Sequence, residues 1–454
     1  MSDDIRNVDL PDSEPQTSDT DAEIIARATG QRRGRSNAPK SNPKSGASRK
    51  ASRKRFKKQV KSTVSGWRKA GRIFLWLLMA VVSAGMFISG FSGHIAPASV
   101  KWVAFPPMTF PGWLIALILL TVLSAFTYRK PLLLALVTWI GCLHPILEYS
   151  PLNFSTPSPK DYPASQRFTF LTYNVANLND LTGNYDGDVN TTLSYIMRTN
   201  ADIVSLQEAV SPAVSGPKHI TPEQVDSLHA LYPYIIMYGR SQMIMSKFPV
   251  TVVHTGEAEM AAALRSKSAG SDDLVKPTAE IAVFRVDVRG TPITVFDLHL
   301  QSYNLSGDDK SLYREITDIK DAEKVKELKS TISQVRKSLL TKVHEAAVLR
   351  QADTERLEQL IAHYGGPNII VAGDFNDVPG SYVINRLENI GFRQVYTEVG
   401  FGPMITFNAN RFYFRIDHVL YRGALRPLRM VRGGSRASDH YPLLTTFAIS
   451  KQDK

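Results

Sequence analysis

Several apolar segments in the second half of the chain end in carboxylate, amide or imidazole side chains. The clearest is NIIVAGDFNDVP, residues 368–379, in which a run of strand-forming residues leads directly to Asp374, Asn376 and Asp377. Polar groups at the end of a buried strand must find hydrogen-bond partners or take part in chemistry. Five further segments carry such residues where strands are expected to stop: LTYNVANLND carries Asn174, IVSLQE carries Glu208, VFDLHLQS carries His299, RIDHVL carries Asp417, and RASDHYP carries Asp439 and His440.

Together these residue types suit the metal-assisted hydrolysis of a phosphoester. Carboxylate oxygens bind hard cations such as Mg²⁺, and an Asp or an Asp–His unit can accept the proton of an attacking water. Amide and imidazolium groups can stabilise the charge that develops on phosphate oxygens. A single strand-terminal Asp is more often a helix cap or a turn residue. The inference therefore depends on the whole set.

The elements that must position these residues are short strands mixed with helices. Strand patterns recur from residue 168 to residue 449, some alternating and some continuously apolar. Helical patterns occur near 191–200, 222–231 and 381–390, and a long one from Lys310 to His363 is expected to form two helices. This mixture predicts an α/β sandwich in residues 155–450.

The ordered set Asn174, Glu208, His299, GDFND, RIDHVL and SDHYP resembles the endonuclease/exonuclease/phosphatase superfamily over roughly residues 167–450. The resemblance implies an α/β (α+β) four-layer sandwich, two β-sheets flanked by helices, and a hydrolase that depends on Mg²⁺ or Mn²⁺. A phosphoester would be the substrate, in a lipid headgroup, a nucleotide or a nucleic acid.

The resemblance also implies a role for each residue. Glu208 would be the principal metal ligand, with Asn174 close to the metal and the phosphate. Asp374, helped by Asn376, would activate or orient the water. The imidazole of His440, oriented by Asp417, would contact the phosphate. His299 would be a second imidazole there and a candidate general acid, and Asp439 would bind the metal directly or through water.

Two features refine the comparison. His299 in DLHL resembles the DNase I and sphingomyelinase side of the family, because AP endonucleases carry a tyrosine at that place. Some members have an acid two residues after the first Asn, where this chain has Ala176. A second metal ligand is therefore either missing or replaced, by Asn177 or Asp439, so the number of metal ions stays open.

The net charge of +12 belongs to the N-terminal tail. Residues 1–30 contain eight acidic and two basic side chains, and residues 31–72 contain sixteen basic and no acidic ones. Residues 155–454 contain 33 of each kind, which argues against a dedicated duplex-DNA nuclease. The composition of residues 1–72 predicts a disordered tail, although the basic part is also suited to a helix on anionic lipid headgroups.

Three apolar runs between residues 73 and 150 predict a membrane anchor of three transmembrane helices, about 73–92, 111–128 and 131–148. The alternative is a buried hydrophobic hairpin in a soluble protein. The basic tail and the Arg129–Lys130 turn would both stay in the cytoplasm, which would place the catalytic half outside it, in the periplasm or the extracellular space. The single cysteine, Cys142, excludes an intrachain disulfide and a cysteine-based metal site.

Two other functions compete with hydrolysis. The chain could be a catalytically silent binding or scaffold member, although every expected motif position is filled. It could also be a membrane protein that binds nucleic acid through its basic tail. Arg350, Arg411 and Arg415 are candidate phosphate contacts, but such side chains are more often solvated or paired.

Overall fold

A computed structural model of the chain describes residues 45–181, 189–212, 219–254, 279–303, 324–409 and 412–450. The chain divides into two compact units, Met1–Ala70 and Gly71–Lys454. Arg411 lies outside the described residues, as does most of the segment 302–323.

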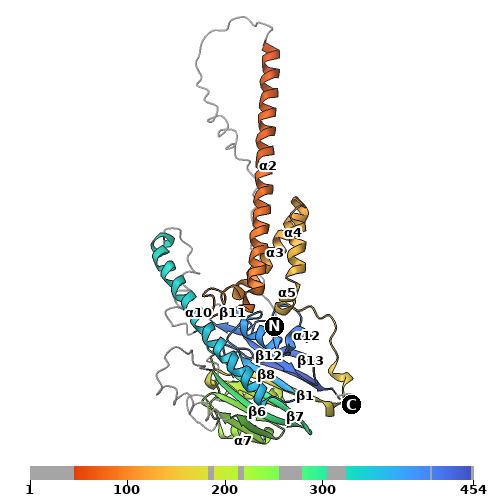
Figure 1. The fold of residues 1–454 in the computed structure, drawn as a ribbon, viewed down its shortest axis with the longest axis vertical. Coiled ribbons are helices and arrows are strands. Elements are labelled where there is room, and N and C mark those ends of the chain that lie inside the picture. Colours follow the sequence, from red (N-terminus) through yellow and green to blue (C-terminus); the bar gives the residue numbers. More distant parts are fainter. Residues whose placement is uncertain are drawn as a thin grey trace, which may run out of the picture. The chain divides into compact units, whose positions relative to one another are not determined.

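The N-terminal helix is longer than the sequence predicts. Helix α2 runs over Ser45–Phe91, so residues 45–72 are helical, which agrees with the basic helix that the sequence allowed and not with a disordered tail (Figure 1). This stretch contains no proline and is rich in Lys and Arg, which are good helix formers. Residues 1–44 lie outside the described residues.

Three further helices contain the other two apolar runs. Helix α3 spans Pro106–Thr127, and the third run forms α4, Leu132–Gly141, and α5, Leu143–Tyr149. The axes of α4 and α5 differ by 65°, and Pro145, which has no N–H to donate to an earlier turn, lies just after the break. By length and composition two helices could cross a membrane, or three if the bent pair counts as one span.

Residues beyond 155 form two six-stranded mixed sheets. The first has the order β13-β14-β1-β2-β4-β3, with β1 and β2 parallel and the other neighbours antiparallel. Its strands are β1 Arg167–Asn174, β2 Ile203–Gln207, β3 Tyr234–Tyr238, β4 Gln242–Ser246, β13 Leu425–Arg432 and β14 Leu443–Ile449.

The second sheet has the order β5-β6-β7-β8-β12-β9, with β7 and β8 as its parallel pair. Its strands are β5 Val250–His254, β6 Glu280–Val288, β7 Thr291–His299, β8 Ile369–Asp374, β9 Arg393–Gln394 and β12 Asp417–Arg422. A separate two-stranded ribbon joins β10, Phe407–Ala409, to β11, Phe412–Phe414.

Three apolar clusters show that the domain has four layers (Figure 1). One cluster, with Phe170, Phe284 and Ile370, fills the space between the two sheets. The helices α6, Thr191–Thr199, and α7, Pro222–Leu231, cover the outer face of the first sheet. The helices α10, Lys324–Tyr364, and α11, Tyr382–Asn389, cover the second. The predicted four-layer sandwich is confirmed.

Smaller elements connect these layers. The structure also contains η1 Ser92–His94, η2 Pro159–Asp161, η3 Ala164–Gln166, η4 Ala176–Leu178 and α12 Val395–Val399. Of the helical stretch expected between Lys310 and His363, residues 310–323 lie outside the described residues, and the rest forms the unbroken helix α10.

Candidate active site

The strand register brings the candidate residues to one edge of the domain. Asp374 on β8 has a register partner on each side. In the parallel β7–β8 pair the partner is His299, and in the antiparallel β8–β12 pair it is Asp417. Asn174, the last residue of β1, is paired with Gln207, the residue before Glu208. Carboxyl ends of parallel strands and the start of an antiparallel neighbour meet at the same place. This explains how residues distant in sequence converge.

Close backbone packing fixes this edge. Gly373 has a φ of +133°, and a Cβ there would lie 2.1 Å from the carbonyl oxygen of Leu298 on β7. Only glycine allows that approach, which sets Asp374 beside His299. Glu208 and Asn376 both have left-handed backbone, with φ of 49° and 48°. Such conformations in residues other than glycine are uncommon and concentrate at functional sites.

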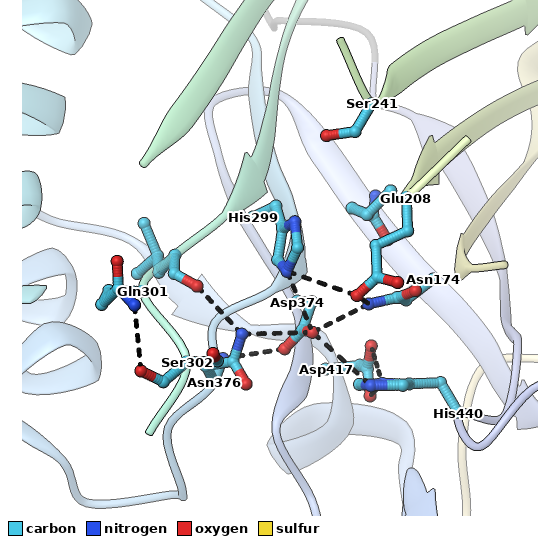
Figure 2. Close-up of polar contacts among 12 residues, drawn as sticks. Asn174, Glu208, Ser241, His299, Gln301, Ser302, Asp374, Asn376, Asp417 and His440 are labelled. Carbon is cyan, nitrogen blue, oxygen red and sulfur yellow. Dashed lines mark hydrogen bonds and ion pairs between the residues drawn. The ribbon is translucent and has the colours of Figure 1, made fainter. Parts of the chain in front are cut away.

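Asn174 lies between Glu208 and Asp374, and the contacts of the group converge on Asp374 (Figure 2). Its Nδ2 donates to Oε1 of Glu208 at 3.1 Å and to Oδ2 of Asp374 at 3.0 Å. Its Oδ1 accepts from the backbone N–H of Ala176 at 3.2 Å. The amide therefore holds two carboxylates, one from each sheet, in fixed positions.

Asp374 is almost completely buried and is held by several donors. Its Oδ1 accepts the backbone N–H of Asn376 at 2.8 Å, and its Oδ2 faces Nδ2 of Asn376 at 3.3 Å. The same Nδ2 donates to the carbonyl oxygen of Leu300 at 2.9 Å, which fixes the Asn376 amide.

His440 and Asp417 form an imidazole–carboxylate pair (Figure 2). Nδ1 of His440 lies 2.9 Å from one oxygen of Asp417 and 3.1 Å from the other, while its Nε2 lies 3.6 Å from Oδ2 of Asp374. Burial lowers the pKa of His440, but the carboxylates of Asp417 and Asp374 outweigh that effect and raise it to about 10. His440 is therefore an imidazolium near neutral pH.

His299 faces the same carboxylates from another direction. Its Nε2 lies 3.7 Å from Oε1 of Glu208 and 3.8 Å from Oδ2 of Asp374. Its side chain is 23% exposed, against 6% for His440. His299 is thus the imidazole that solvent and substrate reach more easily.

Asp439 is the least connected of the predicted residues. Oδ1 of Asp439 lies 3.4 Å from the Ser438 hydroxyl, and that hydroxyl also donates to the backbone oxygen of Asn174 at 2.8 Å. The structure brings seven residues into one network: Asn174, Glu208, His299, Asp374, Asn376, Asp417 and His440. Asp439 borders this network through Ser438.

The donor set fits a divalent cation. Glu208 and Asp374 direct oxygens to the same amide and the same imidazole, and Glu208 is 34% exposed, so its lone pairs remain accessible. A second grouping, Asp374, Asp417 and His440, has possible ligand atoms within 4.8 Å of one another. We favour the side of Glu208, because a cation in the second group would compete with the 2.9 Å contact between His440 and Asp417.

Sequence patterns did not single out Thr406 and Ser438, which support the catalytic segments. The Thr406 hydroxyl accepts the backbone N–H groups of Ile416 and Asp417, each at 3.0 Å. The Ser438 hydroxyl accepts the N–H of His440 at 3.1 Å. Ser438 could have been identified from its position in the SDHYP motif, whereas Thr406 lies in no motif.

Two arginines considered as phosphate contacts are structural instead. Nε of Arg350 forms a 3.0 Å ion pair with Asp377, and Arg350 is buried. Arg415 is also buried, and its Nη2 donates to the backbone oxygen of Glu148 at 2.6 Å.

Comparison with known proteins gives a family match. The model of the Endonuclease/Exonuclease/phosphatase family matches residues 171–440, more than half of the chain. No curated protein matches the chain.

Solved structures of the same fold resemble it at low identity. One is an endonuclease/exonuclease/phosphatase from Beutenbergia cavernae, with 16% identity, a TM-score of 0.39, and coverage of 63% of this chain and 72% of that chain. Another is the Bacteroides vulgatus endonuclease/exonuclease/phosphatase, with 15% identity, a TM-score of 0.37, and coverage of 63% and 99%. A third is Caenorhabditis elegans TDP2, with 14% identity, a TM-score of 0.34, and coverage of 62% and 97%.

Proposed function

The chain belongs to the endonuclease/exonuclease/phosphatase family, and we propose that it is a metal-dependent hydrolase that cleaves a phosphodiester or phosphomonoester by attack of water. The family includes metal-dependent phosphoesterases and nucleases, and its members are usually hydrolases of phosphoester bonds. The observation that carries the proposal is the network around Asp374, in which one buried carboxylate contacts two amides and two imidazoles.

Asp374 is the proposed base. Its carboxylate is held by Asn174 and Asn376, so little reorganisation is needed when it accepts a proton from the attacking water. The Asn376 amide, fixed by the carbonyl of Leu300, helps to keep that carboxylate oriented.

His440 is the proposed donor to a phosphate oxygen. Asp417 holds its Nδ1 and stabilises the imidazolium, which leaves Nε2 and its proton for the substrate. His299, the more exposed imidazole, is the proposed general acid that protonates the leaving oxygen.

Glu208 is the proposed principal ligand of Mg²⁺ or Mn²⁺, with Asn174 beside it and Asp439 as a further candidate. A bound cation would supply positive charge that neutralises phosphate oxygens. The chain's own contribution is to hold Glu208 against Asn174 and to fix the two imidazoles nearby.

Substrate and location belong to the proposal as well. A lipid headgroup, a nucleotide and a nucleic acid remain the candidate substrates. The apolar helices support a membrane anchor, and the charge distribution supports a cytoplasmic tail and an extracytoplasmic catalytic half. Contact between the basic tail and anionic lipid headgroups stays a prediction from the tail's charge.

The test uses the full chain purified in detergent, with bis-(p-nitrophenyl) phosphate as the substrate. EDTA should abolish hydrolysis, and added Mg²⁺ or Mn²⁺ should restore it. Asp374→Ala should remove activity, whereas Asp226→Ala, which changes an exposed aspartate on α7, should not. Full activity of the Asp374→Ala protein would rule the proposal out.

The same preparation decides between the competing functions. A catalytically silent member would show no metal-dependent hydrolysis of DNA, sphingomyelin, phosphoinositides or the synthetic diester. If the basic tail is the working part, deletion of residues 1–72 should abolish nucleic-acid binding. Under the proposed function that deletion leaves hydrolysis intact.

A further inference from the structure

The last turn of α5, at the end of the third apolar segment, is joined to the catalytic half by buried polar contacts. Glu148 is only 5% exposed, and its Oε1 accepts hydrogen bonds from the backbone N–H of Gly380 at 2.6 Å and from Nε2 of Gln394 at 2.8 Å. Its backbone oxygen accepts Nη2 of Arg415 at 2.6 Å. One residue of the proposed anchor therefore contacts three segments of the catalytic domain.

A second anchor segment reaches the same point. Gly93, in η1, lies so close to Gly380 that a Cβ built on it would be 1.8 Å from the Gly380 carbonyl oxygen. Gly380 itself has a φ of +71°, and its carbonyl oxygen accepts a hydrogen bond from Nδ2 of Asn385 on α11 at 3.0 Å. The β8–α11 loop is thus confined between η1, α5 and α11.

Two of the contacted residues lie close in sequence to the proposed catalytic groups. Gly380 is in the loop that begins after Asp374, and Arg415 is two residues before Asp417. The loop is tied down between these points, because Arg350 pairs with Asp377 and Nε2 of His418 lies 3.0 Å from the Asp377 carbonyl oxygen. The contacts at Gly380 and Asp377 together set the path of the short loop that leads back to Asn376 and Asp374.

The environment of Arg415 makes this junction intolerant of change. Its guanidinium is buried over the ring of Tyr396, with the carbon 4.9 Å from the ring centroid. Within the described residues its Nε and Nη1 have no hydrogen-bond partner, and Glu148 and Glu388 are the acidic groups that offset its charge. A buried cation that loses its counter-charge is strongly unfavourable. The segment before Asp417 would move if Glu148 were lost.

From these contacts we infer that Glu148 is a positioning residue for the active site. By holding Gly380 and Arg415, it fixes the segments that carry Asp374, Asn376 and Asp417. The docked end of the anchor is then part of the scaffold of the catalytic centre. The inference rests on the proposed function, since it concerns the rate of the reaction assigned to that site.

The test compares variants of the full chain in detergent with bis-(p-nitrophenyl) phosphate and Mg²⁺. Glu148→Ala removes both side-chain acceptor contacts and should lower kcat by about 10- to 100-fold with little change in KM, as misplaced catalytic groups do. Glu148→Gln retains an Oε1 that can accept from Gly380 and Gln394 but, like Glu148→Ala, removes the negative charge near Arg415, so it should restore kcat only in part. Gly93→Ala, which forces the loop away from η1, should act like Glu148→Ala.

Asn153→Ala is the matched control. Nδ2 of Asn153 also joins the segment after α5 to the catalytic half, by donating to the carbonyl oxygens of Thr397 and Gly400 at 2.9 Å each, but it contacts neither the β8–α11 loop nor Arg415. This variant should keep nearly normal kcat. Thermal unfolding of every variant identifies the fraction folded, and kcat is expressed per folded molecule.

Three outcomes would overturn the inference: normal kcat in Glu148→Ala, equal losses in Glu148→Ala and Asn153→Ala, or a loss that disappears when corrected for the folded fraction. If the unaltered chain hydrolysed none of the substrates, the proposed function would fail instead. An active unaltered chain together with an active Glu148→Ala variant would reject the positioning role alone.

Discussion

Glu208 and Asp439 differ in how they join the rest of the candidate site, and this difference separates their expected contributions to metal binding. Glu208 shares the Asn174 amide with Asp374, whereas Asp439 has a 3.4 Å hydrogen bond with Ser438 and acts on His440 through its charge. Glu208→Gln should raise the Mg²⁺ concentration for half-maximal hydrolysis by at least tenfold, about 1.4 kcal/mol of binding free energy. Asp439→Asn should cause a smaller shift, measured in the same titration. Equal shifts in the half-maximal Mg²⁺ concentration would indicate that Asp439 contributes as much to metal binding as Glu208.

The two imidazoles should respond differently to the leaving group of the substrate. A general acid matters most when the leaving oxygen is basic, and its removal costs about 10²- to 10⁴-fold in such cases. His299→Ala should therefore impair hydrolysis of diphenyl phosphate far more than hydrolysis of bis-(p-nitrophenyl) phosphate. His440→Ala should impair both substrates to a similar extent, because its proposed contact is with a phosphate oxygen. If His440→Ala, and not His299→Ala, impaired mainly the hydrolysis of diphenyl phosphate, His440 would be the general acid and His299 the phosphate contact.

At the scale of elements, buried side chains hold the strand ends that carry the site. His418 on β12 binds the loop after β8 through the carbonyl of Asp377, at 3.0 Å. Burial, together with the charge of Arg415, lowers the pKa of His418 to about 3. His418 is therefore neutral in the folded chain at neutral pH and serves as structural support.

This lowered pKa predicts an acid-sensitive fold. Between the unfolded value of about 6.5 and the folded value, the unfolded chain binds a proton that the folded chain does not, so stability falls as the pH drops. His418 should contribute a loss of about 1.4 kcal/mol in the free energy of unfolding per pH unit below 6.5. Thermal unfolding in detergent at pH 7 and pH 5 should show a smaller difference for His418→Gln than for the unaltered chain. His229→Gln, an exposed control on α7, should leave the difference unchanged, and an unchanged difference in His418→Gln would contradict the prediction.

The elements also show how far sequence patterns reach. Strands such as β1, β7 and β8 were predictable because apolar runs end in recognisable polar motifs. The short β9, β10 and β11 were not, since their pairing depends on β12 and on each other rather than on their own composition. The site residues were predictable as a set, whereas the buried roles of Arg350 and Arg415 depend on Asp377 and Glu148, which are distant in sequence. Such long-range pairs leave no local pattern.

For the whole molecule, the question is where the apolar helices place the catalytic half. The predicted third span is a bent pair of helices. The positive charges of the N-terminal tail and of the Arg129–Lys130 turn favour a cytoplasmic location for both segments. An odd number of spans would then place the segment after Tyr149 on the opposite side. A third segment that did not cross would leave that half in the cytoplasm, so counting spans decides the location.

The single cysteine makes this prediction testable by labelling. In a Cys142→Ser background, Asp226→Cys marks an exposed position of the catalytic half and Lys130→Cys marks the turn between the second and third apolar segments. A membrane-impermeant thiol reagent added to intact cells should label Asp226→Cys and spare Lys130→Cys. Permeabilisation should expose both, which shows that each thiol is reactive. Labelling of neither position before permeabilisation would mean that α4 and α5 do not cross, and that the substrate must be sought in the cytoplasm.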